Sequence, residues 1–200
     1  MTIPARPTAR TVLGDYGRLG VRHILSGPDH LLFVFGLVLL GGTLRRVAGT
    51  VTAFTLGHSV TLSLAALGLA DVPAAPVEVL IALSVWVLAL EVARPPARRG
   101  AIARWPWIAA GGFGLLHGLG FAAALREAGL PSGDVPLALV GFNGGVELGQ
   151  LAFVVAVLAV LAAGRRLPLP APGWLRAAPV TAMGALATYW CLERVAVLVG

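Results

Sequence analysis

The chain has 200 residues, of which 58% are hydrophobic and only 12% charged, and its formal net charge at pH 7 is +6. Soluble domains carry about 25% charged residues, so this composition excludes an ordinary soluble domain and indicates an integral membrane protein. The positive charge comes entirely from arginine, and the arginines do not gather on one polar face but lie mostly in the N-terminal segment and in loops or at the ends of apolar runs, which argues against a nucleic-acid-binding protein. The single cysteine, Cys191, excludes an internal disulfide and a cysteine-based metal cluster. The expected surroundings are membrane lipids.

The N-terminal part of the chain, residues 1–18, is polar and contains no apolar core of the kind that a signal peptide needs. We therefore divide the chain into this polar N-terminal segment and a single transmembrane domain over residues 19–200. Long apolar runs favour helices, because a membrane β-barrel would show short segments of alternating hydrophobicity.

Six apolar runs are long enough to cross the membrane, which takes about 20 helical residues. They lie near residues 19–42, 47–70, 76–94, 104–127, 136–163 and 178–199. The predicted fold is an all-α, polytopic membrane helix bundle with about six transmembrane helices.

The first of these runs contains Pro28, which lacks a backbone donor, so we expect a kinked or broken first helix. The segment from Ser26 to Asp29 is also typical of a helix start, with Ser26 as the cap and Pro28 in the first turn. In that case His23 would lie on a preceding irregular or re-entrant segment. His23 and His30 would share a face of a continuous helix, but not of a helix broken at Pro28.

Arginines are unevenly distributed between the two sides of the predicted bundle. The first, third and fifth loops hold nine of them, against six on the other side. Because cytoplasmic loops are enriched in arginine, we expect both termini to be external, in a multi-pass protein of a bacterial-type inner membrane. The polar residues of five spans would then lie in the outer half of the membrane.

All four histidines lie inside or at the edge of apolar runs, and carboxylates accompany them. Ionisable side chains are costly in a bilayer and therefore suggest a function. Imidazole and carboxylate together suit borderline divalent metals such as Ni2+, Co2+ and Zn2+. The candidate metal ligands are His23, Asp29, His30, His58, His117 and Glu147, with Ser59, Glu78, Asn143 and Gln150 in supporting positions.

Local spacing adds detail to this set. Asn143, Glu147 and Gln150 are four and three residues apart, which places them on one helical face. Glycines beside polar residues predict close helix packing, at positions 144, 145 and 149, and space beside His117, at positions 118 and 120.

A simpler interpretation exists for each polar residue. A single histidine in a bundle is more often hydrogen-bonded between helices than a ligand, but four histidines with two acids favour metal or proton handling. We interpret four hydroxyl residues as interhelical hydrogen-bonding groups: Thr52, Thr55, Ser63 and Ser84. Two neighbouring charge pairs, Glu91 with Arg94 and Glu193 with Arg194, are predicted to be interfacial pairs without a function.

Five motifs over roughly residues 20–155 resemble the HupE/UreJ family in order and composition. They are His23-x5-Asp29-His30, Thr52-Ala-Phe-Thr-Leu-Gly-His58-Ser-Val-Thr, Val77-Glu78-x2-Ile-Ala-Leu-Ser84, Leu116-His117-Gly-Leu-Gly-Phe-Ala and Phe142-Asn143-x2-Val-Glu147-Leu-Gly-Gln150. The single histidine of the fourth motif is closer to a second branch of that family. The resemblance implies a nickel or cobalt permease in which His23, Asp29, His30 and His117 fall in the motifs associated with metal transport.

The leading hypothesis is a permease for a divalent transition metal, most readily Ni2+ or Co2+, with an intramembrane His/Asp/Glu site open to the outer face. The alternative is an intramembrane zinc-dependent hydrolase acting on a lipid or peptide, with Glu78 or Glu147 as the base. The absence of a His-Glu-x-x-His motif makes that enzyme the weaker hypothesis. A metal sensor or accessory subunit ranks last, and the sequence leaves open whether the chain forms a homo-oligomer.

Overall fold

The computed structural model describes residues 8–128, 134–166 and 173–199. Within these residues all regular structure is helical, as the composition predicts. Residues 1–7 of the expected polar N-terminal segment lie outside the described part of the chain.

The first membrane segment is broken, as Pro28 predicts. Helix α1 (Ala9–Ser26) and helix α2 (Pro28–Leu40) meet at Gly27 with a bend of 74°. Pro28 occupies the first turn of α2, where its missing donor costs nothing. The predicted cap is wrong: Gly27 is the N-cap residue, whereas the Ser26 hydroxyl donates back to the Arg22 carbonyl at 2.7 Å. Helix α1 also begins ten residues before the expected span, and His23 lies in its last regular turn, not in an irregular segment.

The remaining long helices agree with the predicted runs to within a few residues. In chain order the elements are α3 (Leu44–Ala66), α4 (Ala74–Ala93), the 3-10 turn η1 (Pro96–Arg98), α5 (Ala101–Arg104), α6 (Pro106–Ala128), α7 (Val135–Arg166) and α8 (Gly173–Val199). The two short elements between α4 and α6 were not predicted.

The number of spans is four or five by length and hydropathy, so the expected count of six is not confirmed. Helices α3, α4, α7 and α8 each qualify alone, and α1 with α2 adds a fifth as a bent pair. Helix α6 matches the expected run in position, but it is not among the spans counted over the described residues.

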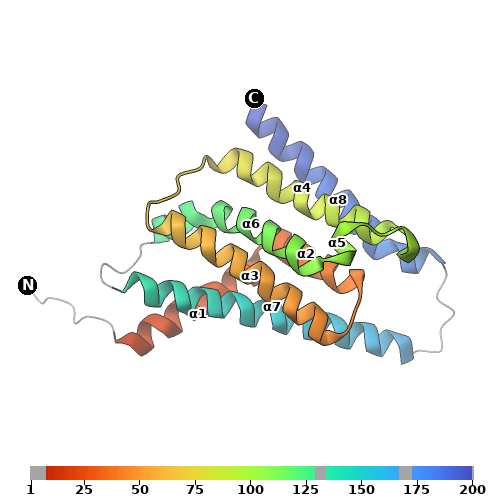
Figure 1. The fold of residues 1–200 in the computed structure, drawn as a ribbon, viewed down its shortest axis with the longest axis horizontal. Helices are drawn as coiled ribbons and strands as arrows, with labels where there is room; N and C mark the ends of the chain where they lie inside the picture. Colours follow the sequence, from red (N-terminus) through yellow and green to blue (C-terminus); the bar gives the residue numbers. More distant parts are fainter. Residues whose placement is uncertain (1–7, 129–133, 167–172, 200) are drawn as a thin grey trace, which may run out of the picture.

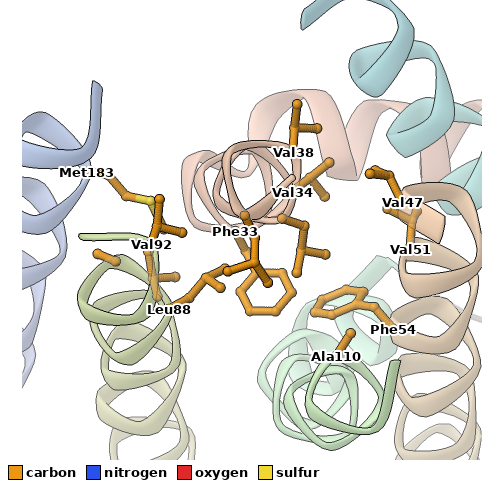
Figure 2. Packing of buried hydrophobic residues seen from close by; sticks show 14 of the residues in the cluster. Phe33, Val34, Val38, Val47, Val51, Phe54, Leu88, Val92, Ala110 and Met183 are labelled. Carbon is orange, nitrogen blue, oxygen red and sulfur yellow. The ribbon is translucent and has the colours of Figure 1, made fainter. Parts of the chain in front are cut away.

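The bundle consists of three helix pairs around one short central helix (Figure 1). Helix α3 packs mainly on α6, α1 on α7 and α4 on α8, while α2 contacts helices of all three pairs. Seven of the thirteen residues of α2 are buried, and a helix that is apolar all round is expected at such a position. Phe33 of α2 packs against Phe54 of α3 and Leu88 of α4 in the main core (Figure 2).

Glycines allow α3 and α6 to cross at backbone contact. A Cβ on Gly57 would overlap the carbonyl oxygen of Gly111, and a Cβ on Gly118 would overlap that of His58. Gly118 therefore serves helix packing and does not open space beside His117. Gly120, in contrast, borders a cavity next to that histidine, as expected.

Helices α1 and α7 cross in the same way. A Cβ on Gly145 would overlap the carbonyl oxygen of Gly17, which confirms the predicted close approach, and Gly20 meets the Phe142 carbonyl similarly. Gly149 makes ordinary contacts with α1, whereas Gly144 faces open space. This crossing positions the last turn of α1, and with it His23.

Candidate metal centre

The break between α1 and α2 brings two histidines together. His23 lies in the last turn of α1 and His30 in the first turn of α2, and their ring centroids are 4.7 Å apart. The expectation that a break at Pro28 would separate these rings is wrong, because the 74° bend folds the two helix ends toward each other.

Two further histidines approach from other helices. The ring centroid of His58, in the middle of α3, is 6.0 Å from that of His30, and the centroid of His117, on α6, is 4.8 Å from it. Two groups of side chains could each hold a metal ion: His23, His30 and His58, and Asp29, His30 and His117. In each group one possible ligand atom per residue lies within 4.8 Å of the others. His30 belongs to both groups.

Asp29 orients the shared histidine. Its Oδ1 accepts a hydrogen bond from the His30 backbone amide at 2.9 Å and lies 3.0 Å from His30 Nδ1. Since a carboxylate only accepts, the hydrogen belongs on Nδ1 and the lone pair stays on Nε2. A second contact orients His117, whose Nε2 is 3.2 Å from the Ser84 hydroxyl.

Most ring nitrogens of the cluster have no hydrogen-bond partner among the described residues. His23 Nε2, His30 Nε2, His117 Nδ1 and both ring nitrogens of His58 are buried in this state. Burying a polar atom without a partner costs free energy, so the large majority of such atoms in proteins are paired. A bound divalent cation would satisfy several of these nitrogens at once, and neutral imidazoles with one carboxylate suit such an ion.

Four phenylalanines surround the histidine rings. The Phe121 centroid is 3.8 Å from that of His23, and the Phe54 centroid is 5.0 Å from that of His117. Phe33 and Phe142 contact His117 and His58 at 5.7 and 6.4 Å. These aromatic residues were not predicted to belong to the site, although each lies within four residues of a histidine or of another polar motif residue.

A cavity of about 200 Å³ borders the cluster. Its lining includes four of the six predicted ligands, His23, Asp29, His30 and His117. Gly27 also lines it, and a Cβ there would lie 2.9 Å from His30 Nδ1 and 3.2 Å from Asp29 Oδ1. Only glycine at this position leaves enough space for the His30 and Asp29 side chains. From the sequence, Gly27 was predicted only to be part of a helix start.

The same cavity is lined by Glu78 of α4 and Arg194 of α8, which form an ion pair at 3.4 Å. Glu78 thus lies near the histidines, as its supporting position in the sequence suggested. Arg194 pairs with Glu78 and not with its neighbour Glu193, because adjacent residues on a helix point in different directions. Glu193 instead accepts a hydrogen bond from Tyr189 at 3.4 Å.

Glu147 lies in a different polar group, between α3 and α7. Its carboxylate accepts hydrogen bonds from Thr52, at 2.5 Å, and from Thr55, whose hydroxyl also lies 2.8 Å from Gln150 Oε1. The structure therefore does not bring Glu147 or Gln150 into either histidine group. Both threonines form hydrogen bonds between helices α3 and α7, as predicted.

The other supporting residues bond mainly within their own helices. Ser59 donates to the Thr55 carbonyl at 2.6 Å, and the Asn143 amide donates to the Leu139 carbonyl at 2.9 Å. Asn143 Oδ1 is buried and has no partner in the described part of the chain. The predicted pair of Glu91 with Arg94 is confirmed at 2.9 Å, but Glu91 is buried and also accepts from the Gly100 and Ala103 amides.

The fold and the cluster define a class of protein: a multi-pass helical membrane protein in which a broken helix and two crossing helices bring histidines and an aspartate together. The HupE/UreJ protein family matches residues 1–194, and the chain belongs to this family of membrane metal transporters. No curated protein and no solved structure matches the chain.

Proposed function

We propose that this protein is a permease for a divalent transition metal, most readily Ni2+ or Co2+, and that the ion binds at the histidine cluster. Membership of the HupE/UreJ family supports nickel or cobalt as the cargo. The observation that carries the proposal is the set of buried ring nitrogens that have no hydrogen-bond partner among the described residues, on four histidines that belong to two overlapping groups, one of which contains Asp29.

In this scheme His30 is the central ligand. Asp29 holds the His30 ring and contributes a negative charge, while His23 and His58 on one side and His117 on the other replace waters of hydration. The two overlapping groups provide two neighbouring positions for one ion. If the ion can move from one position to the other, its binding affinity can be high enough for capture and still low enough for release.

The broken helix suits a cation on electrostatic grounds. The carbonyl end of α1 carries partial negative charge, and Asp29 offsets the positive N-terminus of α2. Transporters commonly bind their substrate between such half-helices near the middle of the membrane.

Passage to the other side requires a conformational change. Phe33 and Phe54 pack against each other at a centroid distance of 5.1 Å, and the buried core in Figure 2 continues beyond them. Rigid-body movement of one helix pair against another is a common means of opening such a barrier.

The orientation is part of the proposal. Arg46, Arg94, Arg98 and Arg99 lie at one end of the bundle, beside the C-terminal ends of α2 and α4, whereas Glu78 and the cavity lie toward the N-terminal end of α4. The arginine-rich end is assigned to the cytoplasm of a bacterial-type inner membrane, so that both termini and the cavity face outward.

Metal uptake by proteoliposomes tests the function. Uptake of Ni2+ or Co2+ is expected for the wild-type protein and should be lost in a double variant, Asp29→Ala with His117→Ala. Asp15→Ala is the matched control, because Asp15 is an exposed aspartate of α1 paired with Arg18. Unchanged uptake by the double variant contradicts the proposal. Stoichiometric zinc that remains bound through dialysis, together with hydrolysis of a lipid or peptide, would instead favour the intramembrane enzyme.

A further inference from the structure

Two cavities meet at the ion pair between Glu78 and Arg194. The inner cavity, of about 200 Å³, borders the histidine cluster. The second, of about 170 Å³, is lined by Ala75, Glu78, Glu193, Arg194 and Val197. Both linings contain Glu78 and Arg194, so this pair lies between the metal cluster and the space at the ends of α4 and α8.

The two partners hold each other weakly. One guanidinium nitrogen, Nη1, lies 3.4 Å from Glu78 Oε2, and Arg194 Nε is buried without a partner in the described part of the chain. An arginine can offer five N–H donors and usually binds a carboxylate through two parallel hydrogen bonds. The Glu78 side chain is 49% exposed and that of Arg194 26%, so the pair is neither sequestered nor held by a network.

The last turns of α8, which carry Arg194, are poorly buried. Helix α8 packs mainly on α4, at the edge of the bundle, and its last turns extend past the other helices (Figure 1). Leu192, Val195 and Val197 on these turns are exposed. The guanidinium can therefore move away from the cavity without disturbing the core.

The charges explain why such movement matters. A divalent cation that approaches the histidines meets a positive guanidinium in the wall of the cavity, and Glu78, a carboxylate in the same wall, is already paired with it. Displacing Arg194 removes this repulsion and frees the Glu78 carboxylate in one step.

We propose that Arg194 controls access to the metal cluster through its ion pair with Glu78. An incoming divalent cation displaces Arg194 from the Glu78 carboxylate, and the ion pair forms again once the cation has passed inward. Arg194 is thus a residue that governs access without being a ligand. This inference rests on the proposed function, because it requires metal to bind at the histidine cluster.

The rate of Co2+ binding to the purified protein in detergent tests this inference, since ligation by histidine changes the visible absorption of Co2+. Arg194→Gln is expected to speed association about threefold or more, and Glu78→Gln to slow it by a similar factor, because charges at the mouth of a site act on the association rate. A purely structural ion pair predicts effects of the same sign, since either change breaks the same contact.

The double variant tests the exchange itself. If Arg194 acts mainly by occupying Glu78, the gain from Arg194→Gln should be clearly smaller when Glu78 is also glutamine, whereas independent charge effects would add. Arg18→Gln and Asp15→Asn, which alter an exposed pair on α1, are the matched controls and should leave the rate unchanged.

The outcomes separate this inference from the proposed function. Wild-type protein that binds no Co2+, Ni2+ or Zn2+ overturns both. Wild-type protein that binds Co2+ while both single variants slow association, or while the double variant shows additive effects, overturns the access role of Arg194 alone.

Discussion

His23 and His30 lie on opposite sides of a 74° bend, yet their ring centroids are only 4.7 Å apart. A continuous helix would place residues seven apart about two turns, or roughly 10 Å, from each other along its axis. The bend at Gly27 thus brings the side chains of His23 and His30, which a straight helix would keep apart, next to each other.

The shared position of His30 predicts unequal effects of histidine substitutions. His30→Ala removes a ligand from both groups and should weaken Ni2+ or Co2+ binding at least about 100-fold, since loss of an outer-shell partner alone costs 10- to 100-fold. His58→Ala removes a ligand from one group and should cost less. Isothermal titration of the purified variants measures both. Equal effects of the two substitutions would contradict a shared ligand.

Gly27→Ala should weaken metal binding while leaving the bundle folded. The new methyl group would lie 2.9 Å from His30 Nδ1 and 3.0 Å from the His23 carbonyl, so it displaces the His30 ring from Asp29. A loss of about tenfold in affinity is expected, as for other disturbances next to a metal ligand. The matched control is Gly14→Ala on the same bent segment, where a Cβ meets nothing within 4 Å. Similar affinities for both variants would refute the role of Gly27.

Ser84→Ala tests how His117 is held. The hydroxyl is the described partner of His117 Nε2 at 3.2 Å, and both residues are buried. Without it the ring loses its fixed orientation, and metal affinity should fall by about tenfold with little change in thermal stability. Ser59→Ala, which removes a hydroxyl bonded only to its own helix among the described contacts, serves as the control. A loss of stability without a loss of affinity would show that Ser84 has a packing role instead.

Gly57→Val should prevent the close crossing of α3 and α6. A Cβ at this position overlaps the Gly111 carbonyl, so the helices must separate, and the expected cost is about 1–3 kcal/mol. The thermal unfolding midpoint in detergent measures this cost, with Gly112→Val on α6 as the control because Gly112 faces open space. Comparable midpoints in the two variants would mean that the crossing tolerates a wider spacing.

Glu91→Ala should destabilise the arginine-rich end of the bundle. The carboxylate accepts from the Gly100 amide at 2.5 Å and the Ala103 amide at 3.2 Å, and it pairs with Arg94. Removing it leaves two amides without their acceptor and should cost at least about 2 kcal/mol, which would lower the thermal midpoint. Metal binding at the distant histidine cluster should be retained. An unchanged midpoint would indicate that water replaces the carboxylate, and that Glu91 is a simple interfacial residue as the sequence analysis supposed.

Much of the fold and part of the site follow from local sequence. Apolar runs gave the helix bounds to within a few residues for five of the six expected spans, because helix length in a membrane is set by hydrophobic thickness. The break at Pro28 was predictable from the missing donor of that residue. Four of the six candidate ligands line one cavity. They could be identified from the sequence because an ionisable side chain in an apolar run indicates a functional position.

Partners between helices could not be predicted, because they depend on helix rotation and crossing, which no single segment determines. Glu147 carries the same charge as Asp29 and was grouped with the histidines, but its face of α7 meets Thr52 and Thr55 of α3. Arg194 was expected beside Glu193, but it contacts Glu78, 116 residues away.

Sequence alone therefore determined that this chain carries imidazoles and acids inside a helical membrane bundle, since that property depends on composition and hydropathy along each segment. Only the tertiary structure decided which of those groups meet, because the bend at Gly27 and the glycine contacts between α3 and α6 place His23, His30, His58 and His117 in one region. Those contacts join residues distant in the chain, and their geometry depends on backbone packing across helices.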